Sequence, residues 1–385
     1  MTDIASMELT AAQVDASQAR LAGLRDRMAK AEVGGLLVSS ENDIWYLTGF
    51  VGHSALLMVT AERAVIICDR RYEELLQAWD ACELFEVVMG ARHKLGLEVK
   101  RLAGEEDLSQ VGIQGESMTI AFRDSLAASI EGLDLVATTG LVSHLRRCKR
   151  PEELALIERA IAIQEQALEE SLAELHPGMT ESEFTALLEY RMRMAGATGA
   201  SFEPIVGSGP NSSVIHHMPG ERPIEDGMLL IDWGARVEGY CSDLTRTMCF
   251  GPMPELMGQV YGIVLEALES AIEACQPGAD CAAVDAVARE VITAAGYGNE
   301  FPHGLGHGVG MDVHEEPFFS NRSAGTTLEP GMVMTVEPGI YLPGVGGVRI
   351  EEDVLITESG YRVLASWPRS LESAQHPSLL SQERC

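Results

Sequence analysis

An internal repeat in the second half of the sequence limits the folds that the chain can adopt. Residues 167–196 (ALEESLAELHPGMTESEFTALLEYRMRMAG) align without gaps to residues 267–296 (ALESAIEACQPGADCAAVDAVAREVITAAG), and eight of the thirty positions are identical. Each copy predicts a helix, a Pro-Gly break and a second helix that stops at a glycine. In the first copy, Thr180 and Glu183 have the spacing of a capping box. The repeat therefore predicts two similar pairs of helices.

A predicted β-hairpin that carries carboxylates follows each copy of the repeat. The strand EDGMLLID (225–232) corresponds to EPGMVMTVE (329–337), and each ends in an acidic residue. The returning strands, YCSDLTRT (240–247) and VRIEEDVLIT (348–357), carry further acidic residues. We therefore predict a C-terminal domain of two pseudo-symmetric helix–helix–hairpin halves, whose strands meet at a central cleft with the helices outside.

The first part of the sequence has a different organisation. Segments of residues 18–82 alternate between amphipathic helix patterns and short apolar strands, which is typical of an α/β domain. Pro151, followed by two glutamates, marks the start of a long helix, and we place the domain boundary just before it. The predicted organisation is an α/β domain over 1–146, a second domain over 147–372 and a loose tail over 373–385.

The overall composition excludes several classes of protein. The 385 residues include 58 acidic and 28 basic ones, a net charge of −30, whereas nucleic-acid binding requires clustered lysine and arginine. The N-terminus lacks the pattern of a signal peptide, and no segment approaches the ~20 apolar residues of a membrane span. Eight cysteines are scattered without CxxC pairs, which favours reduced, buried thiols. We therefore expect a cytoplasmic protein without nucleic-acid or membrane partners.

Two acidic residues of the first hairpin raise an electrostatic problem. In a simple hairpin that turns between Val237 and Glu238, Asp232 and Asp243 would lie opposite each other. Directly opposed like charges destabilise a sheet, and the two groups cannot both ionise cheaply. Either both side chains point to water, or a longer loop shifts the register, or a cation lies between them.

The second hairpin carries acidic residues in comparable places. Glu337 ends an apolar strand, where an unpaired carboxylate is costly. In VRIEED (348–353) alternate side chains share a face, so Glu351 lies with Arg349 and Asp353, whereas Glu352 faces the other way.

Symmetry of the two halves would bring these carboxylates together. Glu337 would correspond to Asp232, and Glu351 would correspond to Asp243. Four converging carboxylates are tolerable only if metal cations bind between them.

A glycine-rich ribbon before the second hairpin supplies histidines. HGLGHGVG (303–310) is unsuited to a helix, because each interior glycine costs about 1 kcal/mol relative to alanine. As an extended ribbon it places His303 and His307 on one side, and its glycines allow close approach of backbone or substrate. One histidine with four carboxylates suits Mn²⁺, Co²⁺ or Fe²⁺, with Zn²⁺ as a further candidate. Two such cations, about 3.5–4 Å apart, would activate a shared water.

The longest motifs resemble those of one enzyme family. IDWGARVEGYCSDLTRT (231–247), FPHGLGHGVGMDVHEEP (301–317) and GMVMTVEPGIYLPGVGGVRIEED (331–353) are similar in order and spacing to motifs of the prolidase, aminopeptidase P and creatinase family. NDIWYLTGF (42–50) and CKRPEELALIERA (148–160) resemble its N-terminal domain and linking helix. The resemblance implies a creatinase-like α/β domain, followed by an α+β "pita-bread" catalytic domain with a pseudo-twofold repeat and a curved antiparallel sheet.

The same resemblance implies roles for individual residues. Asp232 would bind one metal ion, and His307 and Glu337 would bind the other. Asp243 and Glu351 would bridge the two ions. Glu337 would also move a proton during catalysis. The site would further contain three histidines, an arginine that orients carboxylates and a tyrosine near the substrate cleft: His216, His303, His314, Arg349 and Tyr341.

The function that the resemblance implies is peptide hydrolysis. The chain would be a dinuclear metal peptidase, with manganese as the first choice of metal, that acts as a homodimer on small peptides. It would cleave the Xaa-Pro bond as an aminopeptidase or a dipeptidase. The same scaffold also hosts dimethylsulfoniopropionate lyases, creatinase-like C–N hydrolases and metal-free binding modules, which remain alternatives. His217, directly after His216, has no role assigned to it.

Overall fold

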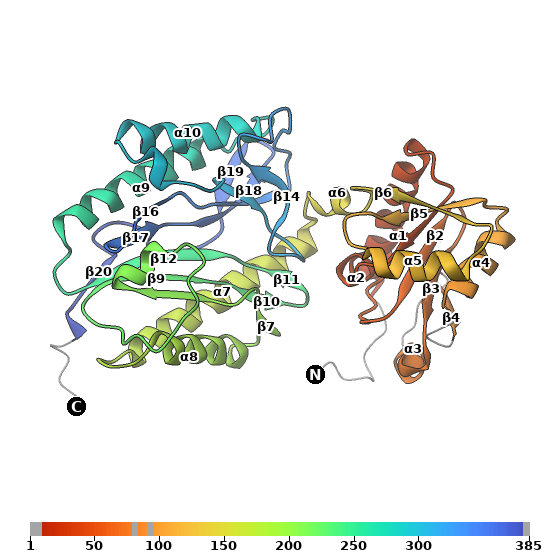
Figure 1. Ribbon diagram of the computed structural model, residues 1–385, viewed down its shortest axis with the longest axis horizontal. Helices are drawn as coiled ribbons and strands as arrows, with labels where there is room; N and C mark the ends of the chain where they lie inside the picture. Colours follow the sequence, from red (N-terminus) through yellow and green to blue (C-terminus); the bar gives the residue numbers. More distant parts are fainter. Residues whose placement is uncertain (1–9, 79–83, 91–94, 380–385) are drawn as a thin grey trace. The chain divides into compact units, whose positions relative to one another are not determined.

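The chain folds into two compact units. The computed structural model describes residues 10–78, 84–90 and 95–379, and the units are Met1–Leu145 and Arg146–Cys385 (Figure 1). The last segment of the alternating pattern, YEELLQAWDAC (72–82), is typical of a helix; Glu73–Ala78 is helical, and residues 79–82 lie outside the described ranges.

The first unit is an α/β domain with a mixed six-stranded sheet. The strand order is β4-β3-β2-β1-β5-β6. The pairs β1/β2 and β2/β3 are antiparallel, whereas β3/β4, β1/β5 and β5/β6 are parallel. Every residue of β1, β2 and β3 is buried, so helices and loops cover both faces of the sheet, which explains their continuous apolar runs.

The elements of the first unit are short and closely capped. The strands are β1 (Gly35–Val38), β2 (Leu56–Thr60), β3 (Ala64–Cys68), β4 (Glu86–Met89), β5 (Gln110–Gln114) and β6 (Asp134–Thr138). The helices are α1 (Ala11–Lys30), α2 (Glu41–Thr48), α3 (Glu73–Ala78), α4 (Leu95–Glu105), α5 (Ile120–Ser129) and α6 (Ser143–Arg146), which reaches the boundary. The NDIWYLTGF motif forms α2, which Ser40 caps at its start and Gly49, with a φ of 75°, ends.

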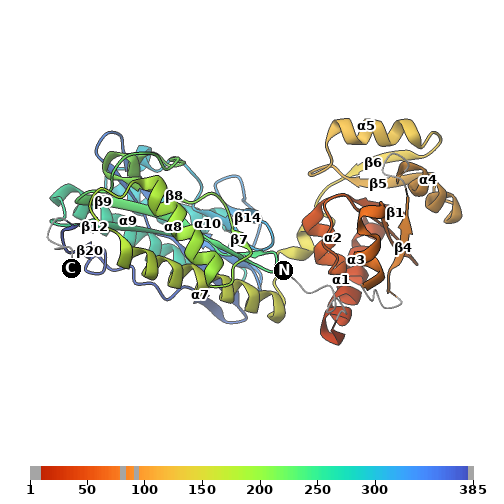
Figure 2. The same cartoon turned by 90° about the horizontal axis from the view of Figure 1, so that it is seen from below.

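The sequence repeat forms two pairs of helices in the second unit (Figure 2). They are α7 (Pro151–Glu174) with α8 (Glu181–Met194), and α9 (Glu255–Ala274) with α10 (Cys281–Ala294). The break within each pair contains a glycine with positive φ, 89° at Gly178 and 83° at Gly278. Glycine adopts this conformation without strain, so both copies turn in the same way. The expected capping box of Thr180 and Glu183 starts α8.

Each pair of helices packs on its own sheet. The first sheet has the order β20-β12-β9-β8, with a small sheet β11-β10-β7 beside it. The second has the order β14-β13-β15-β18-β19, with the ribbon β16-β17. Separate hydrophobic cores form under the two pairs, one around Trp233 and the other around Tyr261 and Phe301. The second unit is therefore two similar halves, as the repeat predicts.

The strands that frame these halves are short. Those of the first half are β7 (Gly199–Ala200), β8 (Ile205–Ser208), β9 (Gly227–Trp233), β10 (Ala235–Val237), β11 (Tyr240–Cys241) and β12 (Leu244–Phe250). Those of the second are β13 (Gly306–Gly308), β14 (Glu315–Phe319), β15 (Val333–Val336), β16 (Gly339–Leu342), β17 (Gly346–Arg349), β18 (Glu352–Thr357) and β19 (Gly360–Val363). The glycine-rich ribbon supplies β13, which pairs with β14 and β15, so it runs along the sheet as expected.

The two sheets meet along β12. The hydroxyl of Thr247 donates to the carbonyl of Arg349 (2.9 Å) and accepts from its amide (3.1 Å). The amide of Glu351 donates to the carbonyl of Thr245 (3.2 Å). Residues 349–351 therefore run beside β12, and the acidic ends of both hairpins come together at a central cleft.

The register of the first hairpin differs from the simple one that the sequence suggested. The turn lies at Glu238 and Gly239, whose φ values are 47° and 90°, as in the tight turns that join right-twisted strands. Asp232 therefore pairs with Thr245, and the expected direct opposition to Asp243 is wrong. Asp243 lies two residues from that partner, on the same side of the strand. Both aspartates can thus point to one place without facing each other.

The pairing in the second hairpin bears on the expected match between Glu351 and Asp243, which stays a prediction. The pairs Val336–Glu352 and Gly339–Arg349 share one register, which sets Glu337 opposite Glu351. In the first hairpin the partner of Asp232 is Thr245, and Asp243 lies two residues before that partner.

Up to Leu379, the C-terminal segment packs on the second unit, so the loose tail that we expected is wrong for these residues. Residues Gln375–His376 form β20, which pairs in parallel with β12. Leu379 is buried, and its amide donates to Asp226 (2.8 Å). The segment binds because it completes the edge of the first sheet; residues 380–385 lie outside the described ranges.

The described cysteines are free, and five of these six are buried. Burial raises the pKa of Cys68 to about 11 and that of Cys275 to about 12, so these thiols are inert at neutral pH. Cys82 and Cys385 lie outside the described ranges. Within those ranges no helix combines the length and apolar character needed to cross a membrane.

A glycine after β9 offers a test of the close packing between the strands. A Cβ at Gly234 would lie 2.0 Å from the carbonyl oxygen of Ser242, which is backbone and cannot move aside. We expect Gly234→Ala to destabilise the second unit by about 1–3 kcal/mol. The control is Gly262→Ala on α9, where nothing lies within 4 Å and where alanine should stabilise by about 1 kcal/mol or less. Calorimetric unfolding measures both, and equal midpoints would contradict the packing argument.

Candidate metal centre

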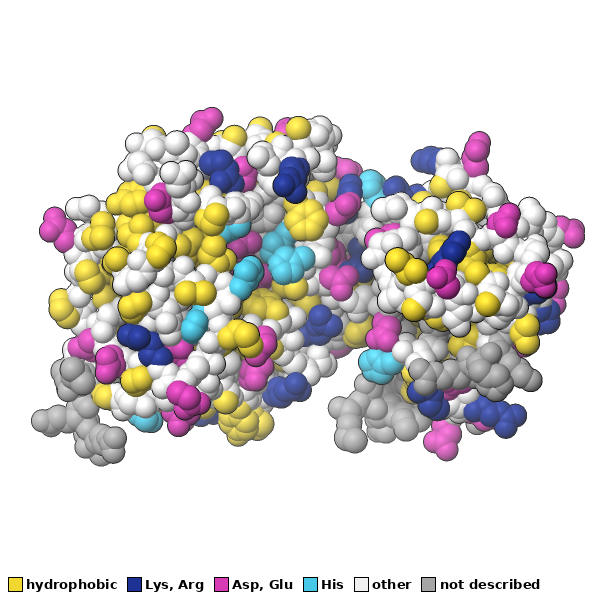
Figure 3. Space-filling view, viewed as in Figure 1, with side chains coloured by type: hydrophobic (Ala, Val, Ile, Leu, Met, Phe, Trp, Pro, Cys, Tyr) yellow, Lys and Arg dark blue, Asp and Glu magenta, His cyan; other side chains and the backbone are white. Residues whose placement is uncertain are grey.

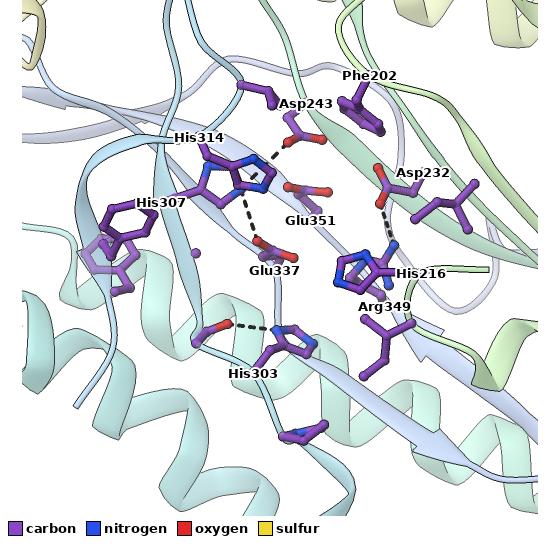
Figure 4. A pocket seen from close by; sticks show the side chains of 18 of the residues that line it. Phe202, His216, Asp232, Asp243, His303, His307, His314, Glu337, Arg349 and Glu351 are labelled. Atoms are coloured by element: carbon purple, nitrogen blue, oxygen red, sulfur yellow. Dashed lines mark hydrogen bonds and ion pairs between the residues drawn. The ribbon is translucent and has the colours of Figure 1, made fainter. Parts of the chain in front are cut away.

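A cavity of about 900 Å³ opens in the second unit where the two sheets meet. Figure 3 shows histidine side chains gathered on this face of the unit, with hydrophobic side chains around them. Figure 4 shows that acidic side chains from both halves point toward a common centre in this cavity. The described lining includes Asp232, Asp243, Glu337 and Glu351.

Three carboxylates form the centre of the site. Asp232 lies near the end of β9, Asp243 just before β12, and Glu351 between β17 and β18. One oxygen from each lies within 4.8 Å of the others. Asp232 Oδ1 is buried and has no hydrogen-bond partner in the described structure. A buried, unpartnered carboxylate oxygen among other carboxylates is a strong indication of a cation site.

Glu337 and His307 stand beside these carboxylates. Nε2 of His307 lies 3.4 Å from Glu337 Oε1 and 3.8 Å from Asp243 Oδ2. Its Nδ1 lies 3.1 Å from the carbonyl of Gly308. A carbonyl only accepts hydrogen bonds, so Nδ1 carries a proton and Nε2 faces the acidic cluster. Burial lowers the pKa of His307, but the hydrogen bond and the charge of Glu337 outweigh burial and raise this pKa. A divalent cation at the cluster would take the place of the Nε2 proton, so this nitrogen is a candidate metal ligand.

The electrostatics of the site require a positive charge. Burial, and after it the charge of Glu351, raises the pKa of Asp243 well above its usual range. Burial, and then the charge of Glu337, does the same for the pKa of Glu351. Burial also raises the pKa of Asp232, although Arg349 opposes this shift. The donor set therefore fits divalent cations, which would let all the carboxylates ionise at neutral pH.

Arg349 is the cation that the protein itself supplies. Its guanidinium is buried and donates to Asp232 Oδ2 (2.5 Å), Tyr341 Oη (3.0 Å) and Thr245 Oγ1 (3.0 Å). The Thr245 hydroxyl in turn donates to Glu351 Oε2 (2.6 Å). Arg349 therefore orients Asp232 directly and Glu351 through Thr245.

The hydrogen bonds define the protonation of His303. Its Nδ1 donates to the carbonyl of Gly304 (2.8 Å), and its Nε2 lies 2.9 Å from Tyr341 Oη. Because Arg349 donates to the Tyr341 oxygen, the hydroxyl proton is free to point at His303 Nε2. Burial lowers the pKa of His303, in keeping with a neutral ring.

Two predicted site residues therefore have supporting positions. Tyr341 is buried, with a pKa that burial raises to about 12, and it is absent from the described lining of the cavity. Its hydroxyl bonds Arg349 and His303, so it orients the arginine, and its contact with substrate stays a prediction. His303 lines the cavity, but both of its nitrogens are used by the protein.

The remaining histidines border the open part of the cavity. The ring of His314 lies 4.2 Å from that of His307, and burial, followed by the charge of His307, lowers its pKa. Its neighbour Glu315 is buried and accepts from Lys149 (3.2 Å) and Arg146, which fixes this loop. His216 is exposed to the cavity from the opposite side (Figure 4).

Sequence reasoning missed some residues that shape the site. Thr245 had a usable signal, since it lies two residues after Asp243 on the same strand face. Asp353 was placed on the correct face without a role; its Oδ2 accepts from the Asp243 amide (3.1 Å), and burial raises its pKa to about 7. Glu352 faces the other way, as predicted, and binds Arg246 (2.8 Å).

Comparison with known proteins agrees with this geometry. The sequence pattern of metallopeptidase family M24 matches residues 155–358, and that of the creatinase/prolidase N-terminal domain matches residues 20–148. The chain is 34% identical over 346 residues to a Xaa-Pro dipeptidase of Pyrococcus horikoshii, covering 89% of this chain and 96% of that protein.

Solved structures are equally similar. A Xaa-Pro dipeptidase from Bacillus anthracis superposes with a TM-score of 0.87 at 36% identity, covering 92% of this chain and 99% of that one. An X-Pro aminopeptidase from Thermotoga maritima gives 0.81 at 33% identity, covering 91% and 99%. These likenesses extend over both units.

Proposed function

We propose, since the chain belongs to metallopeptidase family M24, that this metallo-hydrolase cleaves the Xaa-Pro bond at the N-terminus of small peptides. The observation that carries the proposal is the convergence of Asp232, Asp243 and Glu351 with Glu337 and His307 in the wall of one cavity. The proline requirement is supported by the activities named for the similar dipeptidase and aminopeptidase.

The ligand assignment rests on the donor atoms of this chain. Asp232 would hold one divalent ion, and His307 and Glu337 the other, with Asp243 and Glu351 between the two. When bound, the ions would lower the pKa of a water molecule and polarise the scissile carbonyl. We infer that manganese is the natural metal, because four carboxylates and one imidazole form an oxygen-rich set.

Protein side chains supply the remaining chemistry. Glu337 lies at the edge of the cluster, where its carboxylate can take a proton from the attacking water and pass it to the leaving nitrogen. His314, kept neutral by burial and by His307, can donate a hydrogen bond to the carbonyl oxygen as that oxygen gains charge. His216 borders the same space from the first half.

The assembly and location belong to the same proposal. The family resemblance supports a homodimer, and the free, mostly buried cysteines are in keeping with the reducing cytoplasm.

One assay tests the proposed reaction. Gly-Pro, a longer Xaa-Pro-Yaa peptide and a Gly-Ala control are incubated with the enzyme reconstituted with Mn²⁺, Co²⁺ or Zn²⁺, and bound metal is measured in the same samples. We expect release of the first residue from Xaa-Pro peptides alone, fastest with Mn²⁺, at two metal ions per chain. Metal binding without cleavage of any Xaa-Pro peptide would point instead to lyase or C–N hydrolase chemistry on this scaffold.

Arg322 is the side chain that we expect to bind a free substrate carboxylate. Of the arginines that line the cavity, Arg289 donates to Asp285, and Arg349 to Asp232. Arg322 is exposed, and the described residues offer its guanidinium no acceptor. Arg322→Gln should raise KM for Gly-Pro about tenfold, the loss of one hydrogen bond to a charged group. A C-terminally amidated Xaa-Pro-Yaa peptide should be unaffected.

The control for this prediction is Arg159→Gln, which removes an exposed arginine paired with Glu238 (3.3 Å). It should leave both KM values unchanged. An equal rise in KM for the dipeptide and for the amidated peptide would mean that Arg322 does not bind the free carboxylate of the substrate.

A further inference from the structure

His216 and His217 are adjacent in the chain but have different surroundings. His216 is exposed to the cavity, and its imidazole has no hydrogen-bond partner among the described residues. His217 also lines the cavity, but its side chain is only 15% exposed, and its Nε2 lies 2.8 Å from Glu181 Oε2. The second histidine of the pair is therefore tied to the protein, whereas the first is free to meet a substrate.

Glu181 is the centre of a group of contacts that holds the histidine-bearing loop. It begins α8, and its side chain is fully buried. Oε1 accepts from the amide of Ser208 (2.8 Å) and from Asn211 Nδ2 (2.9 Å), and Oε2 accepts from His217 and from the amide of Gly220 (3.2 Å). A carboxylate at the start of a helix is stabilised by the helix dipole, so this buried charge is a firm anchor.

A second set of contacts fixes the loop before His216. The hydroxyl of Ser212 accepts from the amide of Gly347 (2.9 Å) and donates to the carbonyl of Gly209 (2.6 Å). A Cβ at Gly347 would lie 2.2 Å from the Ser212 carbonyl, so the loop packs directly on β17. His216 thus lies between an anchor at Ser212 and an anchor at His217, and the part of the chain that the structure describes offers its imidazole no hydrogen-bond partner.

We propose that His217 is a positioning residue, whose hydrogen bond to Glu181 holds the loop so that the imidazole of His216 faces the cavity. His217 directly follows His216, and its side chain bonds a buried carboxylate. A hydrogen bond to a charged group contributes more to stability than one to a neutral group. The doubled histidine is therefore one substrate-facing group and one anchor. As far as activity is concerned, the inference rests on the proposed peptidase function.

Two substitutions of His217 with similar polarity separate positioning from a general structural effect. The amide nitrogen of glutamine reaches about the position of Nε2, so His217→Gln can still donate to Glu181, whereas the shorter side chain of His217→Asn cannot. We expect the asparagine variant to lower kcat about tenfold with KM within about twofold, and the glutamine variant to keep kcat within about twofold. His176→Asn, at an exposed histidine of the same unit, is the control and should leave kcat and KM unchanged.

A double-mutant cycle asks whether His217 acts through His216. If it does, His217→Asn should lower kcat in the wild-type background and cause no further loss when added to His216→Ala. The NMR signal of the His216 imidazole, identified by its absence from His216→Ala, gives a readout that needs no activity. In the full chain loaded with Zn²⁺, this signal should shift in the asparagine variant and stay in place in the glutamine variant.

The outcomes are distinguishable from failure of the proposed function. If no Xaa-Pro peptide is cleaved, the peptidase proposal fails and the NMR comparison still tests the anchor. Equal losses in the asparagine and glutamine variants, an additive loss in the His216→Ala background, or an unshifted His216 signal in the asparagine variant would each overturn the positioning role. Bound metal measured in every variant excludes an indirect loss of the metal centre.

Discussion

Asp243→Asn should reduce kcat by about 10³-fold or more, which corresponds to about 4 kcal/mol of lost transition-state stabilisation. The substitution keeps the size of the side chain but removes the charge at the middle of the acidic cluster, where Asp243 lies beside Asp232 and Glu351. Measurement of bound metal by mass spectrometry should show fewer than two ions per chain. Turnover within tenfold of wild type would refute the metal centre.

The same variant should affect stability in opposite directions with and without metal. The pKa of Asp243 is raised well above its ordinary value of 3.8, first by burial and then by Glu351, so the metal-free fold disfavours its ionised form. Stability of the metal-free wild type is therefore full below that ordinary value and falls as the pH rises through the raised pKa. At neutral pH with a chelator, Asp243→Asn should melt at a higher temperature than wild type.

With saturating Mn²⁺ the order should reverse, because ligand binding to the folded state stabilises wild type more than the variant. Glu358→Gln, in the exposed turn after β18, is the control and should follow wild type in both conditions. If the variant melts below wild type even in the chelator, the carboxylates do not repel one another in the metal-free fold, and the electrostatic argument for the site is wrong.

Arg349→Met should be the most destabilising single substitution at the site. Arg349 is buried and donates to Asp232, Tyr341 and Thr245, so a methionine would leave a buried carboxylate without its positive partner. Breaking a buried ion pair from one side costs about 3–5 kcal/mol. Loss of the residue that orients a ligand should also weaken Mn²⁺ binding by about 10–100-fold. Thermal unfolding and titration calorimetry measure the two effects.

An exposed pair provides the comparison for Arg349→Met. Arg362 on β19 bonds Glu158 (2.5 Å), but the two side chains are 49% and 40% exposed to solvent. Arg362→Met should cost at most about 1 kcal/mol and leave Mn²⁺ affinity unchanged, because solvent screens such pairs. Arg349→Lys should fall between wild type and Arg349→Met, since a single ammonium nitrogen cannot reach the three acceptors that the separate nitrogens of the guanidinium reach. Equal costs at positions 349 and 362 would mean that burial of Arg349 does not matter.

The helices and the pairing of the two halves could be read from local sequence signals. Pro-Gly breaks, a capping box and glycine stops are short-range features, and the chain uses them at the same places in both copies. The acidic and histidine residues of the site could be found for a similar reason. A carboxylate at the end of an apolar strand, such as Glu337, costs free energy when it is buried without a partner, so its presence there indicates a function.

Register and side-chain partners could not be read in this way. The turn at Glu238–Gly239 shifted the pairing of Asp232 to Thr245, and the sequence alone gave no measure of that shift. The tail through Leu379 joined the first sheet because an open strand edge was available there. The partnership of Glu181 with His217 links positions 36 residues apart and left no local pattern.

The sequence by itself determined the elements, their repetition and the charged groups that a metal centre needs, because these depend on neighbours along the chain. The tertiary structure decided which oxygen is left for a cation, which nitrogen of His303 carries the proton, which nitrogen of His307 faces the carboxylates, and which histidine of the pair at 216–217 is an anchor. Those properties depend on hydrogen bonds between distant segments, whose geometry exists only when the two halves pack together.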